Sequence, residues 1–443
     1  MRLHRIVAAT VFLLSAISVS AQNTASPTPA AVQPSNNWVD SSTGHRVFKL
    51  TSENESNSLY FYENAFTPDG QEMIYSAHNT AITDKWVQNI YVVNLTTLKS
   101  RLLISSPVGS LVVARKSPIV YFTRPDDTTL YAIGVDSGVI SKVATLPKGA
   151  SISSLNTDDT VIAGAYDEVE APKHSSDYDQ QIKDGKDVTE AYSAAKAKSM
   201  DERLTDHVPM SLYTLNLQTG EVKSILHSTD WISHVQFSPT DPTLLMYCHE
   251  GLWNKVDRIW TIRADGRNNT LIHKRTVNGE IAGHEFWDPD GKTIWYDLQV
   301  PRGQNFYLAS YNTETKARKW YSVERDAWSI HYNVAAGDKL FCGDGSDYAQ
   351  VAHSKDGKWI ELFTPRESPV PTEVDQTDLV QSGFMVSTHL VNLSKQIYLN
   401  EPNVRFSPDK KLVIFTSNML GPSYVYAVEV AKAKVTPPAT GVQ

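Results

Sequence analysis

Cysteine, basic charge and long apolar runs are all scarce in this 443-residue chain. Cys248 and Cys342 are its two cysteines, too few to hold a chain of this size together, so we expect buried free thiols and a stabilising hydrophobic core. The formal net charge of −8 argues against a nucleic-acid partner, because phosphate neutralisation requires a basic surface. Beyond the N-terminal region, no segment reaches the roughly 20 apolar residues that a membrane-spanning helix needs.

The N-terminal segment has the pattern of a secretory signal. Two arginines precede an apolar run, and small residues follow at the expected cleavage point. We therefore predict a signal peptide over residues 1–21 and a secreted or periplasmic protein. Residues 22–37 and 436–443 are rich in small and polar residues and are predicted to be a disordered linker and a flexible tail.

A repeated unit runs through residues 38–435. Turns of the type F-x-P-D-G begin at Phe66, Phe237, Trp287 and Phe406, and aromatic-containing runs such as LYTLNLQTG and IWTIRADG recur between them. Asp-Gly and Thr-Gly favour hairpins, and the spacing of roughly 40 to 55 residues is typical of four-stranded propeller blades. Seven strand units predict an all-β fold, a seven-bladed β-propeller.

One interval, between the strands at Leu130 and Leu212, is too long for a single blade. It contains a charged, alanine-rich segment that favours helix, and we predict a helical surface insertion over residues 167–206. Two roles are open for it. It is either a solvated decoration or a lid that brings Arg203 or Lys198 to an acidic ligand.

Histidines, carboxylates and tryptophans concentrate in three motifs, HVQFSPTDP, CHEGLWNKVDRIW and GHEFWDPDG. CHEG and GHEFW place His249, Glu250, His284 and Glu285 beside aromatic residues at predicted strand ends, where burial and neighbouring charges change pKa values. This is the pattern of a functional site, although histidines bonded to backbone carbonyls would produce it too.

CHEG, VDRIW and GHEFW, in this order, resemble the oligogalacturonate lyases, seven-bladed propeller enzymes that degrade pectin fragments. The resemblance covers most of the mature chain and implies β-elimination on short galacturonate chains, with 4,5-unsaturated uronates as products. His284 would be the base for the C5 proton, and Arg258 would face the substrate carboxylate. The alternative for Arg258 is an ion pair with Asp257 or Glu250. His234 and His249 match family positions and are predicted, with Arg203, to bind substrate, purely structural roles being the alternative.

The resemblance also implies a divalent metal, typically manganese, held by histidines and a glutamine. His331 in SIHYN matches one ligand. The others come from a Gln-x-x-His-x-His segment, where this chain has Glu401 and Asn403 in place of the histidines and Gln396 nearby. Oxygen ligands favour manganese, calcium or magnesium over zinc or copper. Loss of the metal site is the alternative.

Two further functions stay open. The protein could be a non-catalytic exported propeller that binds acidic oligosaccharides, or a lyase for another uronate-containing glycan, because loop shapes set sugar specificity. A prolyl-peptidase-like enzyme is excluded, since the chain lacks a G-x-S-x-G elbow and room for a hydrolase domain. The sequence leaves the oligomeric state open.

Overall fold

The computed structural model describes residues 36–79, 87–337, 339–350, 358–369 and 379–434. The predicted signal peptide, most of the predicted linker and the predicted tail lie outside the described residues. In the part of the chain that is described, no helix is both long and apolar enough to cross a bilayer.

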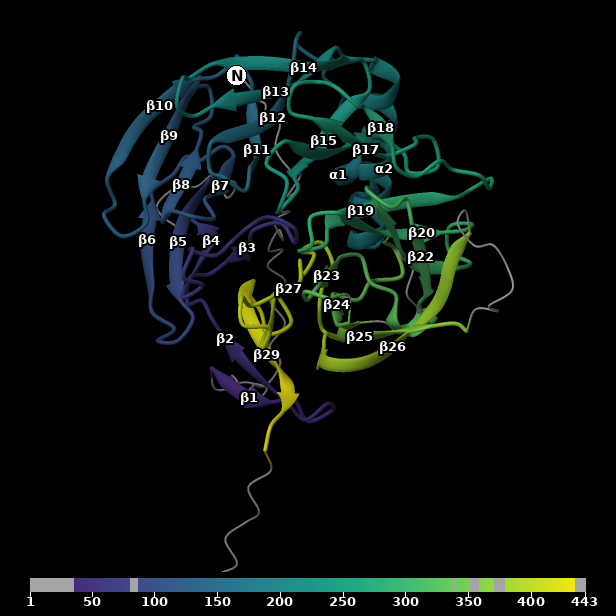
Figure 1. Cartoon of the computed structure of the whole chain (residues 1–443). Coiled ribbons are helices and arrows are strands. Elements are labelled where there is room, and N and C mark those ends of the chain that lie inside the picture. Colours follow the sequence, from purple (N-terminus) through teal and green to yellow (C-terminus); the bar gives the residue numbers. More distant parts are fainter. Residues whose placement is uncertain (1–35, 80–86, 338, 351–357, 370–378, 435–443) are drawn as a thin grey trace, which may run out of the picture.

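The described residues form six β-sheets that follow one another around a common centre (Figure 1). Four of them contain four consecutive antiparallel strands each. These strands are β3 (Asn57–Ser58), β4 (Glu72–His78), β5 (Gln88–Asn94) and β6 (Ser100–Ile104); β7 (Leu111–Val113), β8 (Ile119–Phe122), β9 (Thr129–Gly134) and β10 (Ile140–Thr145); β11 (Ser151–Leu155), β12 (Val161–Asp167), β13 (Met210–Asn216) and β14 (Val222–Ser228); β15 (Trp231–Phe237), β16 (Leu244–Glu250), β17 (Ile259–Arg263) and β18 (Thr270–Leu271).

A larger sheet has eight strands in the order β19-β20-β21-β22-β26-β25-β24-β23. Its strands are β19 (Ile281–Trp287), β20 (Thr293–Gln299), β21 (Phe306–Asn312), β22 (Arg318–Ser322), β23 (Tyr332–Val334), β24 (Phe341–Gly343), β25 (Trp359–Glu367) and β26 (Val380–Asn392), with a short 3-10 helix at Arg325–Ala327. The pair β22 and β26 is parallel, whereas the other pairs in this sheet are antiparallel. The sheet is thus two antiparallel groups of four strands joined at one parallel pair.

The last sheet joins the two ends of the described chain. Its order is β1 (Asn37–Val39), β2 (His45–Lys49), β29 (Tyr424–Lys432), β28 (Leu412–Ser417) and β27 (Arg405–Phe406). Val47 of β2 pairs with Val428 of β29 and both are fully buried, so each contributes about 2 kcal/mol of apolar burial to closing the ring.

The Asp-Gly turns of the repeat have a clear steric cause. In the turn between β19 and β20, Gly291 has a φ of 70°, and a Cβ there would lie 2.0 Å from Thr240 Oγ1. Asp290 Oδ1 accepts hydrogen bonds from the backbone N–H groups of Lys292 (2.7 Å) and Thr293 (2.8 Å). The turn therefore requires an aspartate followed by glycine.

Two helices, α1 (Tyr178–Lys183) and α2 (Val188–Asp206), lie between β12 and β13. The Asp187 side chain caps α2 by accepting from Thr189 N at 2.8 Å. Residues Ala191 and Met200 of α2 are buried, and Lys255 reaches Asp201 at 2.5 Å. One face of α2 therefore packs against the sheets.

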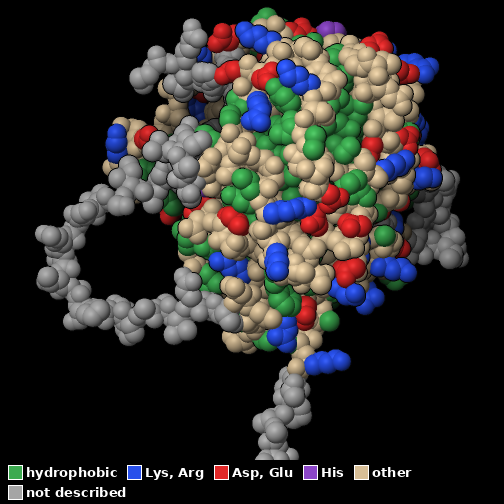
Figure 2. Space-filling view, turned by 90° about the vertical axis from the view of Figure 1, so that its left-hand side faces the viewer, with side chains coloured by type: hydrophobic (Ala, Val, Ile, Leu, Met, Phe, Trp, Pro, Cys, Tyr) green, Lys and Arg blue, Asp and Glu red, His purple; other side chains and the backbone are tan. Residues whose placement is uncertain are grey.

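Both cysteines are buried free thiols, as expected. On the face shown in Figure 2, Lys and Arg side chains are interspersed with Asp and Glu side chains. That face offers no continuous basic surface of the kind that binds nucleic acid.

Candidate functional site

His234 and His284 occupy corresponding places on two neighbouring inner strands, β15 and β19. Each lies at an irregularity in strand pairing, and each has a positive φ, 48° and 46°. A non-glycine residue in this conformation costs on the order of 1 kcal/mol. The bulges bring His234 to Tyr62 and His284 to His331, and bulges commonly re-aim side chains at functional sites.

His284 is oriented by a buried carboxylate. Its Nδ1–H donates to Asp297 Oδ1 at 2.7 Å, and the two side chains are only 10% and 2% exposed. Because a carboxylate can only accept, this bond places the imidazole hydrogen on Nδ1 and leaves the Nε2 lone pair available. The His284 ring lies 4.9 Å from that of His331, centroid to centroid.

His331 is fully buried and has an unused nitrogen. Its Nδ1–H donates to Asp344 Oδ2 at 2.7 Å, whereas Nε2 has no hydrogen-bond partner among the described residues and lies 3.7 Å from Glu401 Oε2. Burial lowers the pKa of His331, but Asp344 and then Glu401 outweigh it and raise this pKa. For Glu401, burial raises the pKa, but Lys196 and His331 outweigh it and lower this pKa.

Asn403 has a second unused buried atom in the same place. Its backbone N–H donates to Asp344 Oδ2 at 3.2 Å, and its Oδ1 is buried without a partner. Buried polar atoms are nearly always paired. The open Nε2 of His331 lies 3.7 Å from the Glu401 carboxylate, and Asn403, with its open Oδ1, shares Asp344 with His331. These atoms are of the kinds that ligate divalent cations, and Asp344 orients His331 as carboxylates commonly do for metal-binding histidines.

Gln396, the fourth predicted metal ligand, does not join this group. Its Oε1 accepts from Ser417 Oγ (2.7 Å) and Asn418 N (3.1 Å), and its Nε2 donates to Asn400 O (2.6 Å). Counting back three residues from Glu401 in a Gln-x-x-His-x-His pattern reaches Tyr398, whose Oη donates to Asp344 O at 2.9 Å. Gln396 instead uses both ends of its amide to hold its own loop.

Arg258 is buried between two carboxylates. Its Nη1 donates to Glu250 Oε1 at 2.6 Å and its Nε to Glu285 Oε2 at 2.9 Å, and the side chain is 4% exposed. Burial raises the pKa of Glu250, but Arg258 outweighs it and holds this pKa well below its usual range. Asp257, the other partner considered from sequence, pairs with Arg275 at 3.0 Å. The ion pair that competes with substrate binding is therefore present, and it involves Glu285 as well as Glu250.

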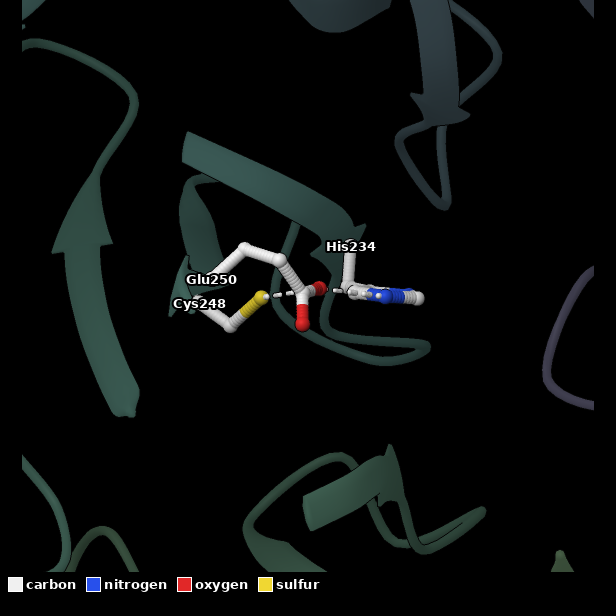
Figure 3. A group of neighbouring side chains, drawn as sticks. All are labelled: His234, Cys248 and Glu250. Carbon is white, nitrogen blue, oxygen red and sulfur yellow. Dashed lines mark hydrogen bonds and ion pairs between the residues drawn. The ribbon is translucent and has the colours of Figure 1, made fainter. Parts of the chain in front are cut away.

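His234, Cys248 and Glu250 form a second group in which the ligand atoms all lie within 4.8 Å of one another (Figure 3). These atoms already have partners. His234 Nε2 bonds Glu250 Oε2 at 3.0 Å, and the Cys248 thiol, whose pKa burial raises, lies 3.1 Å from Ser233 Oγ. Because these atoms are already bonded, the open atoms of His331 and Asn403 make the better metal site.

The other two predicted substrate-binding residues contact different parts of the molecule. His249 Nδ1 lies 3.4 Å from Asp230 Oδ2 and its ring is 5.0 Å from Trp260. Burial outweighs Asp230 and lowers the pKa of His249. Arg203 donates to Asp167 Oδ1 at 2.5 Å, a contact that ties α2 to β12. The structure brings neither of them to His284 and His331.

Several residues of the site were missed from sequence. Asp297 and Asp344 each follow their histidine by 13 residues, a regularity that could have revealed them. Tyr62, from the aromatic run before the first F-x-P-D-G turn, bonds His234 Nδ1 at 3.0 Å. Lys196 of α2 has its Nζ 4.0 Å from Glu401 Oε1, and no sequence motif around Lys196 indicated this contact.

Comparison with known proteins shows which family this chain resembles. A family model described as oligogalacturonate lyase matches residues 33–434. The oligogalacturonide lyase of Pectobacterium atrosepticum is 25% identical over 404 residues, covering 89% of this chain and 95% of that protein. The oligogalacturonate lyase of Dickeya dadantii is 24% identical over 410 residues, with the same coverage.

Solved structures share the fold. An oligogalacturonate lyase in complex with manganese superimposes with a TM-score of 0.70 at 21% identity, and the match covers 89% of this chain and 96% of that one. An oligogalacturonate lyase from Vibrio parahaemolyticus gives a TM-score of 0.68 at 20% identity with the same coverage. The resemblance carried by CHEG, VDRIW and GHEFW is confirmed: the chain belongs to the oligogalacturonate lyase family.

Proposed function

We propose that this protein is a lyase that cleaves short oligogalacturonates by β-elimination and releases 4,5-unsaturated uronate products. The observation that carries this proposal is the pairing of His284 with Asp297, which leaves a basic nitrogen free beside His331. Family membership supports the reaction class.

The proposed reaction needs a base, a cation and a leaving group. His284 Nε2 takes the C5 proton, and the Asp297 carboxylate stabilises the imidazolium that results. The electron pair of the C5–H bond forms the C4–C5 double bond as the C4–O bond breaks, and the leaving oxygen gains a proton to become a hydroxyl group. Negative charge grows on the C5 carboxylate during proton removal, so a cation beside that carboxylate lowers the barrier.

We propose that Lys196, rather than Arg258, is the protein cation that meets this carboxylate. Arg258 is held by Glu250 and Glu285 and is almost inaccessible, so a direct clamp would require it to leave a buried carboxylate unpaired. Lys196 is 32% exposed, and its one ion pair among the described residues is the long contact of 4.0 Å to Glu401. The role that fits Arg258 is to fix Glu250, which in turn bonds His234.

We further propose a divalent metal, manganese by analogy with the solved relative, with calcium or magnesium as alternatives. His331, Glu401 and Asn403 would hold it. When bound, it would supply positive charge to a neighbouring carboxylate. The lysine from α2 would then lie at the edge of the same site.

We infer that the fold is a seven-bladed propeller over residues 38–435. The inference divides the eight-stranded sheet at the parallel pair of β22 and β26, which leaves seven units of four strands, with β1 as an addition to the last. Export of the chain as a secreted or periplasmic protein is also a proposal, and it rests on the N-terminal sequence pattern.

The test is incubation of the purified protein with di- and trigalacturonate while recording the ultraviolet absorbance of the conjugated uronate product. His284→Ala should abolish the absorbance increase, and Asp297→Asn should lower kcat strongly, because the wrong imidazole tautomer is then favoured. Both variants must keep the wild-type melting profile. No product from wild type with or without manganese would refute the proposed reaction.

One observation favours a second candidate. The family histidines are replaced by Glu401 and Asn403, as would suit a relative that binds acidic oligosaccharides without cleaving them. Calorimetric binding of trigalacturonate without product formation would select this function. Product from a different uronate-containing glycan alone would assign a different substrate to the same chemistry.

A further inference from the structure

A cavity of about 310 Å³ lies among the inner strands, apart from the histidine site. Its wall includes residues at or just after the ends of β7, β11, β15, β19, β23 and β27. Phe61 lines it and also contacts the His331 ring, with centroids 4.7 Å apart. His234, His284 and His331 do not line it, so Phe61 stands between the cavity and the proposed catalytic group.

The charged residues that line the cavity are mainly basic. Its charged lining residues are Arg115, Arg405, Lys410 and one acid, Glu63. The carboxylates close to Arg115 and Lys410 have other partners. Asp159 accepts hydrogen bonds from the backbone N–H groups of Arg115 (3.0 Å) and Lys116 (2.8 Å). Asp158 pairs with Lys116, and Asp409 pairs with Lys411. No ion pair of Arg115, Arg405 or Lys410 is found within the described ranges.

Arg405 is the most deeply buried of these cations, at 3% exposure. Its Nη1 and Nη2 donate to the backbone carbonyls of Glu63 (2.6 Å) and Tyr60 (2.7 Å), but its buried Nε has no partner. Burial lowers the pKa of Arg405 to about 10, and the opposing effect of Glu63 does not compensate. A buried donor left without a partner among the described residues is unfavourable on a cation, so an anion near it would be stabilising.

We propose that this cavity binds a small oxyanion, a carboxylate or a phosphate, through Arg115, Lys410 and Arg405. The cavity volume is near the lower limit of the volumes usual for ligand-binding pockets. The ligand is therefore limited to about the size of one sugar acid or a phosphate ion. Two cations without ion-pair partners and one unsatisfied guanidinium supply the charge that such a ligand needs. The site is independent of the proposed lyase reaction.

The experiment measures binding of inorganic phosphate, galacturonate and neutral galactose by calorimetry at constant ionic strength. The variant R115Q/K410Q removes both accessible cations. The control variant R267Q/K292Q removes the same charge from exposed residues that pair with Asp265 and Glu314. The variant His284→Ala tests whether anion binding depends on the histidine site.

We expect phosphate or galacturonate, but not galactose, to bind wild type, the control variant and His284→Ala. Affinity should fall at least tenfold in R115Q/K410Q, and Arg115→Gln alone, which perturbs the fold less, should give part of this loss. Binding of galacturonate alone would identify a sugar carboxylate as the ligand, and binding of both would identify any small oxyanion. Equal affinity in wild type and R115Q/K410Q, loss of binding in His284→Ala, or no binding of either anion would overturn the proposal.

Discussion

Replacing Glu63 by glutamine should make the protein more stable above neutral pH. Glu63 is partly buried and accepts a hydrogen bond from Tyr60 N at 3.0 Å. Burial raises its pKa from 4.5 to about 7, although the Tyr60 N–H, Arg405 and His234 oppose this rise. The folded protein therefore retains a proton on Glu63 between pH 4.5 and 7 that the unfolded chain releases.

The sign and size follow from proton linkage. A carboxyl whose pKa is higher in the folded state stabilises that state most at pH values below its unfolded pKa, and this contribution is lost as pH rises through the folded pKa. A difference of about 2.5 pKa units corresponds to at most about 3.4 kcal/mol in the free energy of unfolding. Glutamine keeps the hydrogen-bond acceptor and cannot ionise, so Glu63→Gln should match wild type near pH 4.5 and exceed it at pH 8.

Urea unfolding of wild type and Glu63→Gln at a series of pH values measures this difference. Glu221→Gln, at an exposed position, is the matched control and should follow the wild-type pH profile. The expected result is a gap between Glu63→Gln and wild type that opens between pH 5 and pH 8. Parallel profiles, with a constant difference at every pH, would refute the reasoning that burial raises this pKa.

Two predictions concern the proposed metal and substrate groups. Lys196→Met should raise KM for trigalacturonate about tenfold, because the loss of one charged contact of about 1.4 kcal/mol weakens binding by this factor, and the melting temperature should change little. The control is Lys198→Met, which removes the neighbouring lysine from the same helix. Equal KM values for wild type and both variants would exclude Lys196 from substrate binding. Manganese at a hundredfold excess over its Kd should stabilise the chelator-treated protein by about 2.7 kcal/mol. Glu401→Gln should weaken this stabilisation. A wild-type melting temperature that manganese leaves unchanged would count against the metal site.

The sequence was sufficient for features that depend on local pattern. The recurring Asp-Gly turns and strand-forming runs predict an all-β chain because a hairpin needs only its own few residues, as Gly291 shows. His284 stands out for a similar reason, since it lies in the short GHEFW motif on β19. His331, which directly precedes β23, was indicated by the family resemblance. The helix over Val188–Asp206 follows from its alanine-rich composition and its Asp187 cap.

Tertiary structure decided which partners these residues have. Arg258 meets Glu285 from the next sheet, Lys196 reaches Glu401 from an inserted helix, and Gln396 turns away to bond Ser417. Each of these contacts joins segments at least 21 residues apart in sequence, and the packing of neighbouring sheets, loops and the inserted helix brings them together. Charge pairing and burial depend on that packing, so a residue type and its spacing reveal a candidate group, whereas only the packed structure determines whether the group is free to act.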